Sequence, residues 1–488
     1  MNRKIIFISL ILVLHTAFLS AQSSRVLYFM NLPQNRTLNP ALRSTDSVYV
    51  GLPGLSGIGM NVNNNLLNFS DVFSKGSNDS LYSFLHPSKN IDDFISTIRK
   101  KNFVEPVVTI PVFSLAFPVR KGYLFLDVNE RAEMNLVVPG SLIEFALKGN
   151  AGYVGDKLDL SAFRAGMRMY HEIGLGYSRN YTSKLRVGIK GKILLGVASV
   201  SVKPRTLGIT VNNDYSHTLN ADLNVNISGP IDVVRDAENN IDDFVFDDDN
   251  MLNYMTLKGP KNLGLAFDFG ATYKLTRKIT LSAAVTDFGF INWKNNTTNL
   301  KTDDKYVFNG FDVTEVLNGD KTFDEVAEQL GDSLKNSFSF TETYDPYKTI
   351  LPMGLNIGGN YAVSKNFSVG VLSSSRIIGR QFRQALTLSG NVKLGNMFST
   401  SLSYSAENHR LDNIGVGMML KLGWLQFYVL SDNIPIAWNK FESYDNMGNP
   451  ENKVMLPNNW NTVDLRLGMN LVFGNRKARK EARMVAKQ

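Results

Sequence analysis

The 488-residue chain contains no cysteine. This excludes a disulfide framework, a thiolate metal site and a lipid-modified N-terminal cysteine. No segment has the run of about 20 apolar residues that a membrane-spanning helix needs. The chain also lacks a Gly-x-Ser-x-Gly elbow, a phosphate-binding loop, a dinucleotide fingerprint and a His-Glu-x-x-His metal motif. We therefore expect neither enzymatic activity nor a cofactor.

The first residues have the pattern of an export signal. Two basic residues at positions 3 and 4 precede the apolar run Ile5–Leu14, and small residues follow up to Ala21. A membrane anchor is the alternative, but His15 interrupts the run too early for a spanning helix. We expect residues 1–21 to be a signal peptide.

The formal net charge of +8 belongs mainly to the two ends of the chain. Without the two basic residues of the signal and the five net charges of residues 475–488, the body carries about +1. We therefore expect a solvated basic tail on the periplasmic side, and no nucleic-acid partner.

Strict alternation of apolar and polar residues dominates the rest of the chain. It is clearest near the C-terminus, where Val463, Leu465, Leu467, Met469, Leu471 and Phe473 alternate with Asp464, Arg466, Gly468 and Asn470. The same pattern fills 185–197, 263–273 and 398–405, so one face of each strand suits lipid and the other water. A soluble β-sandwich is the alternative, but it rarely keeps charges on one face of so many long strands. The pattern predicts an all-β protein, a transmembrane antiparallel β-barrel.

Connection lengths predict the number of strands. Six short turns are expected, at 120–122, 181–183, 276–278, 364–366, 395–396 and 423. With an opening strand over 47–62 and a closing strand over 462–473, these hairpins give about 14 strands within residues 47–474. Long external loops are expected at 63–102, 137–159, 203–261, 294–349 and 433–459, with helical patterns at 91–101 and 323–335. Both termini would then be periplasmic.

An acidic run in the third long loop is the one candidate metal site. Asp247, Asp248 and Asp249 could ligate calcium through carboxylate oxygens. The alternative is a merely solvated loop, because the glycine and the final glutamate of an EF-hand loop are missing. The sequence therefore assigns no metal.

Two strand ends share a short pattern. Asp287 and Asp432 are each followed by isoleucine four residues on and by tryptophan two residues further, Trp293 and Trp438. We interpret the aspartate as turning the chain out of the bilayer and the indole as an anchor at the membrane interface. A binding motif is the alternative interpretation.

Proline interrupts the second predicted strand. Pro111 lies within the expected barrel wall, where it removes a ladder donor and implies a local break. Two interpretations are open, a bulge that shapes the wall and a lateral opening through it.

Several short motifs occur in the order of a known kind of barrel. Leu38-Asn39-Pro40-Ala41 precedes the first strand, and Tyr49–Pro53, Ser56–Gly59, Asp287–Ile291 and Leu471–Gly474 follow. In these motifs the chain resembles FadL-like outer-membrane barrels and the secretion-associated barrels PorV and PorP/SprF. It resembles most a Bacteroidota family of uncharacterised barrels of this type.

The resemblance implies a barrel whose residues 22–46 form a hatch in the lumen, with Asn39, Pro40 and Ala41 within it. It also implies that Pro111 could mark a side exit into the outer leaflet. One expected function is passive transport or binding of hydrophobic or amphipathic molecules, with outer-membrane lipid and such a ligand as partners. The other is a non-enzymatic scaffold for type IX secretion or surface attachment, with secretion-system proteins as partners. The acidic loop and the basic tail depart from fatty-acid transporters, and the sequence does not choose between the two functions.

Overall fold

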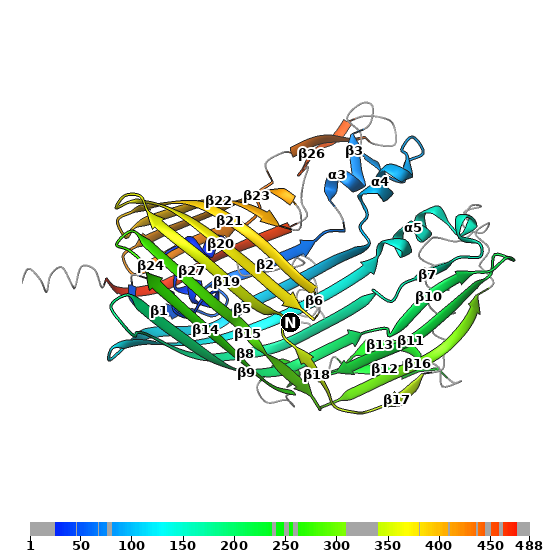
Figure 1. The fold of residues 1–488 in the computed structure, drawn as a ribbon, viewed down its shortest axis with the longest axis horizontal. Coiled ribbons are helices and arrows are strands. Elements are labelled where there is room, and N and C mark those ends of the chain that lie inside the picture. The colour runs from blue at the N-terminus through cyan, green and yellow to red at the C-terminus, as the bar shows by residue number, and fades with distance from the viewer. Residues whose placement is uncertain are drawn as a thin grey trace, which may run out of the picture.

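The computed structural model describes residues 25–44, 46–66, 68–75, 81–236, 241–247, 253–256, 262–308, 340–379, 381–407, 410–435, 438–444, 450–457 and 462–475. The expected signal peptide, the tail beyond residue 475 and the helical pattern at 323–335 lie outside these ranges. The main element is a closed antiparallel barrel of 14 strands (Figure 1). The predicted fold class and strand number are confirmed.

The first strand of the barrel is formed by two segments, β1 (Asp46–Gly51) and β2 (Ile58–Asn64). Both pair with the last strand, β27 (Thr462–Asn475), which closes the wall. The strands between them follow one another around the barrel in chain order. They are β5 (Lys101–Val119), β6 (Gly122–Pro139), β8 (Arg164–Asn180), β9 (Leu185–Val202), β14 (Asn262–Lys274), β15 (Ile279–Trp293), β19 (Met353–Ala362), β20 (Phe367–Ile378), β21 (Gln381–Leu394), β22 (Phe398–Glu407), β23 (Arg410–Leu422) and β24 (Leu425–Ser431).

All six predicted short turns are present and join neighbouring strands. Local chemistry explains several of them. The Thr276 hydroxyl accepts hydrogen bonds from the backbone N–H groups of Lys278 and Ile279, at 3.1 and 3.0 Å. Gly395 and Gly423 have positive φ, of 60° and 62°, which tight hairpins require. These turns lie at one end of the barrel, on the left in Figure 1, which we call the turn end.

The predicted faces of the strands are also confirmed. Leu263, Leu265 and Phe267 of β14 point outward and are exposed, while Asp268 beside them is fully buried in the lumen. In β27, Leu467 faces outward and Arg466 inward. The barrel therefore presents an apolar belt outside and a polar wall inside.

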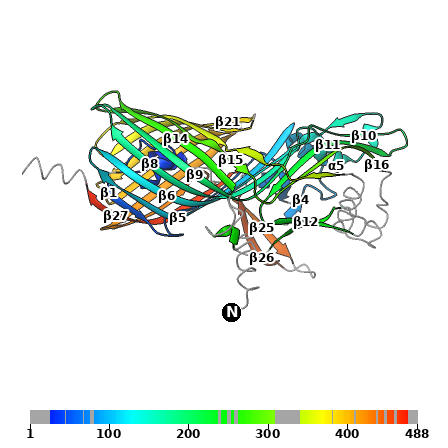
Figure 2. The ribbon, with the colours of Figure 1, turned by 90° about the horizontal axis from the view of Figure 1, so that it is seen from below.

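The opposite end, called the loop end, is more regular than the sequence analysis expected. β7 (Lys157–Asp159), β10 (Thr206–Val211), β11 (His217–Ser228), β16 (Thr297–Phe308), β17 (Thr341–Thr343) and β18 (Tyr347–Ile350) extend the barrel sheet beyond the wall (Figure 2). β11 and β16 pair over their whole lengths. The prediction of loops over 203–261 and 294–349 was therefore wrong for these parts, because alternating strands continue past the barrel rim.

Smaller elements complete the loop end. The two-stranded pairs are β3 (Phe73–Lys75) with β4 (Leu81–Ser83), β12 (Ile231–Arg235) with β13 (Ile241–Phe246), and β25 (Trp438–Tyr444) with β26 (Pro450–Pro457). The helices are α3 (Phe69–Val72), α4 (Ile91–Thr97), α5 (Gly140–Lys148) and the 3-10 turn η3 (Ala151–Tyr153). The helix predicted at 91–101 is thus confirmed in its first part. Within the described ranges, no helix has the length and apolar character to cross a membrane.

Residues 25–44 lie inside the barrel towards the turn end, and we call them the plug (Figure 1). The plug contains α2 (Arg25–Phe29) and the 3-10 helix η1 (Pro33–Thr37). Its apolar side chains pack against inward residues of the wall. This cluster contains Val26, Leu27, Tyr28, Met30, Leu32 and Leu38 of the plug with Leu372, Met419, Tyr428 and Leu430 of the wall. Burial of this apolar surface holds the plug in place.

Candidate functional site

The start of the plug is fixed by carboxylates of the wall. Asp432, directly after β24, accepts hydrogen bonds from the backbone N–H groups of Arg25 and Val26, at 2.6 and 2.9 Å. The Arg25 guanidinium pairs with Glu407 at 2.5 Å, and both side chains are buried. Asp432 therefore caps the N-terminus of α2. The chain leaves the barrel strand at this residue, because β24 ends at Ser431, while the Asp432 side chain points to the plug.

Further contacts hold the middle of the plug. Arg36 pairs with Asp127 of β6 at 2.6 Å, and both are buried. The Gln34 side-chain amide donates to Asn470 of β27 at 2.7 Å. Tyr28 and Ser282 share a hydrogen bond between their hydroxyl groups. The plug is thus attached to several sides of the barrel.

Asn39, Pro40 and Ala41 form a tight, buried turn at the end of the plug. The Asn39 amide donates to the backbone carbonyls of Ala271 and Ala283, at 3.2 and 3.3 Å, and its oxygen accepts from the Ala41 N–H at 2.8 Å.

Two inward glycines of the wall make room for this turn. A Cβ at Gly270 would lie 2.0 Å from the Asn39 side-chain oxygen, and one at Gly188 2.5 Å from the Pro40 backbone. The motif therefore fits a surface that only glycine provides.

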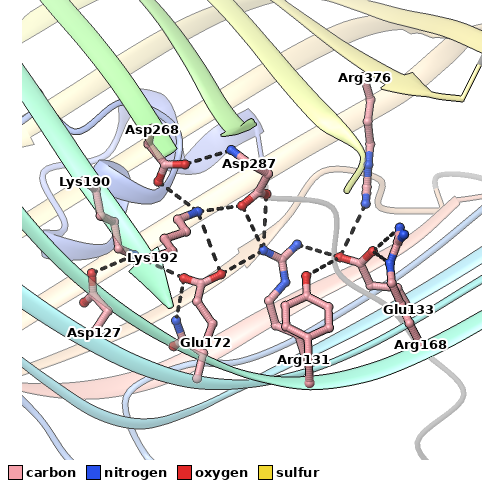
Figure 3. A network of polar contacts seen from close by, with 12 residues as sticks. Asp127, Arg131, Glu133, Arg168, Glu172, Lys190, Lys192, Asp268, Asp287 and Arg376 are labelled. Atoms are coloured by element: carbon pink, nitrogen blue, oxygen red, sulfur yellow. Dashed lines mark hydrogen bonds and ion pairs between the residues drawn. The ribbon is translucent and has the colours of Figure 1, made fainter. Parts of the chain in front are cut away.

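Beyond the plug the lumen contains a network of buried charges (Figure 3). Lys192 contacts Asp287 at 2.5 Å and Asp268 at 2.9 Å. Lys190 contacts Glu172 at 3.2 Å. Both lysines lie on the inward face of β9, where the alternation over 185–197 predicts polar residues. Each of them is balanced by more than one carboxylate, which a buried charge requires.

Arg131 of β6 joins this network to a second group of charges. It contacts Glu172 at 3.1 Å and Glu133 at 2.8 Å, and it donates to both oxygens of Asp287 at 3.2 Å. Glu133 also accepts from Tyr170 at 3.0 Å and pairs with Arg168 at 2.7 Å. The network therefore spans strands that are far apart in sequence.

Asp287 reaches the lumen through an irregularity in β15. The register between β14 and β15 shifts near Asp268, and Asp287 has a positive φ of 57°. Its N–H donates to Asp268 at 2.8 Å. An aspartate tolerates this left-handed conformation better than most residues. The bilayer-exit interpretation of Asp287 was wrong, because β15 continues beyond it to Trp293.

The associated tryptophan does not anchor the barrel in lipid either. Trp293 is 0% exposed and packs with Tyr170, Leu194 and Leu351. Its ring N–H donates to Thr349 at 2.8 Å. The expected interface anchor is therefore a core residue, because β18 covers this end of β15.

Two ion pairs cross the lumen near the loop end. Arg383 of β21 pairs with Glu105 of β5, and Arg376 of β20 lies 3.8 Å from Glu133 of β6. The two arginines face each other in the β20–β21 ladder, where like charges repel. Carboxylates from the opposite wall offset this repulsion. We call these two pairs the cross-lumen pairs.

A cavity lies between the plug and the cross-lumen pairs. Its empty volume is about 1250 Å³, part of it open to solvent. Its charged lining consists of Arg36, Arg131, Lys190, Lys192, Arg376, Arg383 and Arg466, against Asp127, Glu172, Asp287 and Glu407. Further carboxylates lie just behind this lining, where Asp268, Glu105 and Glu133 pair with Lys192, Arg383 and Arg376. The cavity is therefore strongly polar, with charges of both signs.

The wall beside this cavity is interrupted. The chain leaves the first strand over residues 52–57, so the single opening strand predicted over 47–62 was wrong. On the neighbouring strand the β5–β6 register shifts between Pro111 and Phe113. Gly54 donates to the Pro111 carbonyl at 2.9 Å, and Leu55 is 53% exposed on the outside. We call residues 52–57 with Pro111 the wall break. Pro111 lines the cavity.

The structure describes only one of the three residues of the candidate calcium site. Asp247 follows β13, and its N–H donates to the Pro230 carbonyl at 3.1 Å. Asp248 and Asp249 lie outside the described residues. Within the described ranges, no group of three acidic or histidine side chains has the arrangement to hold a metal ion.

Fold and lumen together define a plugged antiparallel barrel with a charged interior and an interrupted wall. The chain belongs to a family of unknown function, DUF5723, whose model matches residues 40–432. No curated protein sequence matches it.

Solved structures with a similar shape include two toluene transporters and a FadL homologue. TbuX of Ralstonia pickettii has a TM-score of 0.41 and 6% identity, over 94% of this chain and 97% of that one. The Pseudomonas aeruginosa FadL homologue has a TM-score of 0.39 and 10% identity, over 94% and 98%. TodX of Pseudomonas putida has a TM-score of 0.37 and 9% identity, over 94% and 95%. Because these identities and TM-scores are low, the substrates named for these proteins are not assigned to this chain.

Proposed function

We propose that the protein spans an outer membrane, with its turn end and termini on the periplasmic side, and binds and passes an amphipathic small molecule. The apolar belt supports the location, because exposed leucine, phenylalanine and valine side chains alternate with buried polar ones along the strands. Membrane lipid is then the surrounding partner of the barrel. Nothing in the described part of the chain favours a secretion scaffold.

The observation that carries this proposal is the contact between the cavity and the wall break. Gly57 and Pro111 belong to the wall break, and both line the cavity. On the outside, Leu55 and Ile58 are exposed at the level of the belt. A molecule with a polar head and an apolar tail would match both environments, with its head in the charged lumen and its tail towards lipid.

Two barriers control the passage in this proposal. The cross-lumen pairs narrow the entry from the loop end, and the plug blocks the turn end. Asn39, Pro40 and Ala41 keep the plug seated on the wall, and Pro111 marks the side exit. Ligand entry then requires the cross-lumen pairs to separate, while release into the leaflet leaves the plug in place.

Cells provide a direct test. Cells carrying the protein should take up tritiated dodecanol faster than cells without it. Pro111→Val restores a ladder donor and should slow this uptake while the barrel remains assembled. Pro118→Val is the matched control, because Pro118 lies on the same strand in regular register near the turn end. Equal uptake with and without the protein would refute the proposed function, and equal uptake by the two proline variants would refute the side exit.

A further inference from the structure

A second hollow of the lumen lies at the turn end, and we call it the turn-end pocket. Its empty volume is about 580 Å³, part of it open to solvent, and it shares no lining residue with the cavity beyond the plug. Arg43 at the end of the plug forms one side of it. The wall forms the other side, with Lys184 and Arg186 of the β8–β9 hairpin and Lys274 of β14. The described part of its lining contains these four cations and no acidic residue.

The seated plug separates this pocket from the cavity. Along the inward face of β9, Lys190 lines the cavity, Gly188 lies under the Asn39–Ala41 turn, and Arg186 lines the turn-end pocket. On the cavity side carboxylates balance the cations, as Glu172 does for Lys190. The plug therefore divides the lumen into a compartment with charges of both signs and a smaller one lined by cations.

The cations of the turn-end pocket lack a carboxylate partner. Among the residues that the structure describes, no carboxylate oxygen lies within 4.0 Å of a charged nitrogen of these four side chains. The Arg43 guanidinium lies over the Tyr123 ring at 4.1 Å, and the Arg186 Nε donates to the Asn180 side-chain oxygen at 2.8 Å. Both of these partners are uncharged.

Two of the cations are also close neighbours in the wall. The Lys274 N–H donates to the Lys184 carbonyl at 2.9 Å, so the two lysines lie side by side on adjacent segments. Like charges at such positions repel each other. An anion between the plug and these segments would offset the repulsion and supply the missing counter-charge.

The chemistry of the lining fits a phosphate group. Ser183, Thr272 and Thr280 add hydroxyl donors to the guanidinium and ammonium groups. A phosphate monoester carries about −1.5 to −2 charge and three acceptor oxygens, so it can pair with several of these groups at once. The surrounding surface attracts anions as well, because the six short turns contain no acidic residue and five basic ones, Arg120, Lys121, Arg277, Lys278 and Lys365.

We propose that the turn-end pocket binds a phosphate group that bridges Arg43 of the plug to Arg186 and Lys274 of the wall. The group comes from a soluble phosphate or from a phospholipid headgroup of the adjacent leaflet, and both present the same kind of oxygens. Because the bound phosphate contacts plug and wall together, its binding and the seating of the plug stabilise each other. The site does not require that any molecule passes through the lumen.

Equilibrium binding to the full chain in dodecyl maltoside, a detergent without phosphate, tests this with radiolabelled orthophosphate and radiolabelled phosphatidylglycerol as probes. Arg186→Gln and Lys274→Gln should each weaken binding about 10- to 100-fold, the range for one charge-assisted hydrogen bond. Lys365→Gln is the matched control, because it removes a cation of the turn end that lies outside the pocket. Heat-modifiable gel mobility shows that each variant remains assembled.

The seating of the plug provides a second measurement. Leu38 is 3% exposed, so Leu38→Cys in this cysteine-free chain reacts with a maleimide only when the plug leaves its site. At ten times its Kd, a bound probe should slow this labelling about 10-fold. Arg43→Gln should remove most of this effect. Because the effect is a ratio of rates with and without the probe, a looser plug in Arg43→Gln does not imitate it.

The outcomes separate a phosphate site from a merely basic surface. Orthophosphate binding that weakens in Arg186→Gln but not in Lys365→Gln supports a soluble ligand, and the same pattern for phosphatidylglycerol alone supports a lipid headgroup. If neither probe binds, or if the two changes weaken binding equally, the phosphate site is refuted. If a probe binds but leaves the labelling rate of Leu38→Cys unchanged, the bridge to the plug is refuted.

Discussion

Removing the Asp432 carboxylate should release the plug. Asp432→Ala deprives the backbone N–H groups of Arg25 and Val26 of their acceptor in a buried environment. Each unsatisfied group costs about 1–3 kcal/mol, while Arg25 keeps its ion pair with Glu407. The two groups together cost about 2–6 kcal/mol, so we expect the population of released plug to rise about 30-fold or more.

A single introduced cysteine can report this release, because the native chain has none. Leu27 of α2 is fully buried, so Leu27→Cys reacts with a maleimide only when the plug leaves its site. The labelling rate of the folded barrel then follows the released population. Asp432→Ala in this background should raise that rate about 30-fold or more.

The matched control is Asp222→Ala, which removes an acid that pairs with the exposed Arg205 at the loop end. Surface pairs contribute about 0–1 kcal/mol, so this change should leave the labelling rate almost unaltered. An unchanged rate in Asp432→Ala, with the barrel still intact by heat-modifiable gel mobility, would refute the capping role. A rate raised equally by both changes would point to general destabilisation instead.

Three further predictions concern the belt, the plug surface and the lumen. Leu467→Arg places a cation against lipid and should destabilise the barrel by about 2–4 kcal/mol. The temperature at which the folded band disappears from a heat-modifiability gel should therefore fall. Tyr215→Arg, at an exposed position of the loop end, should leave this temperature unchanged. Gly188→Ala would displace Pro40 and should therefore raise the labelling rate of Leu27→Cys. Gly191→Ala should leave this rate unchanged, because the atom nearest to the added Cβ, in Phe267, is 3.8 Å away. Equal labelling rates in the two variants would contradict the close fit of the plug to Gly188. Glu105→Gln should open the cross-lumen pair with Arg383 and raise the single-channel conductance. Adding Arg383→Gln should change the conductance little further, because the pair is already broken. If Glu105→Gln leaves the conductance unchanged, the cross-lumen pairs are not a barrier.

The barrel could be predicted from the sequence because its signals are local. Alternation assigns each side chain to a face, and a turn needs only a few neighbouring residues, such as the threonine at 276 or the glycines at 395 and 423. The strand number followed from these turns. The break at residues 52–57 was missed although Pro53-Gly54 is a turn signal there, because the alternation resumes directly after it at Ile58.

The lumen could not be predicted in the same way, because its contacts join distant parts of the chain. Arg25 meets Asp432 across 407 positions, and Arg131 meets Asp287 across 156. Alternation placed Lys190 and Lys192 on the inward face but did not reveal their partners. The shared Asp-Ile-Trp pattern did mark Asp287 and Asp432, but it did not reveal that both aspartates contact cations of the lumen.

The inward glycines indicate contacts that the alternation of a single strand does not predict. In an inward position of a barrel strand, a polar or bulky side chain is expected to fill the lumen. Gly188 and Gly270 instead leave bare backbone where the Asn39–Ala41 turn rests, and Gly59 does so beneath Arg466. A glycine on the inward face of an otherwise regular strand therefore indicates that another group approaches the backbone there. At positions 188 and 270 this group is the plug, and at position 59 it is the Arg466 guanidinium.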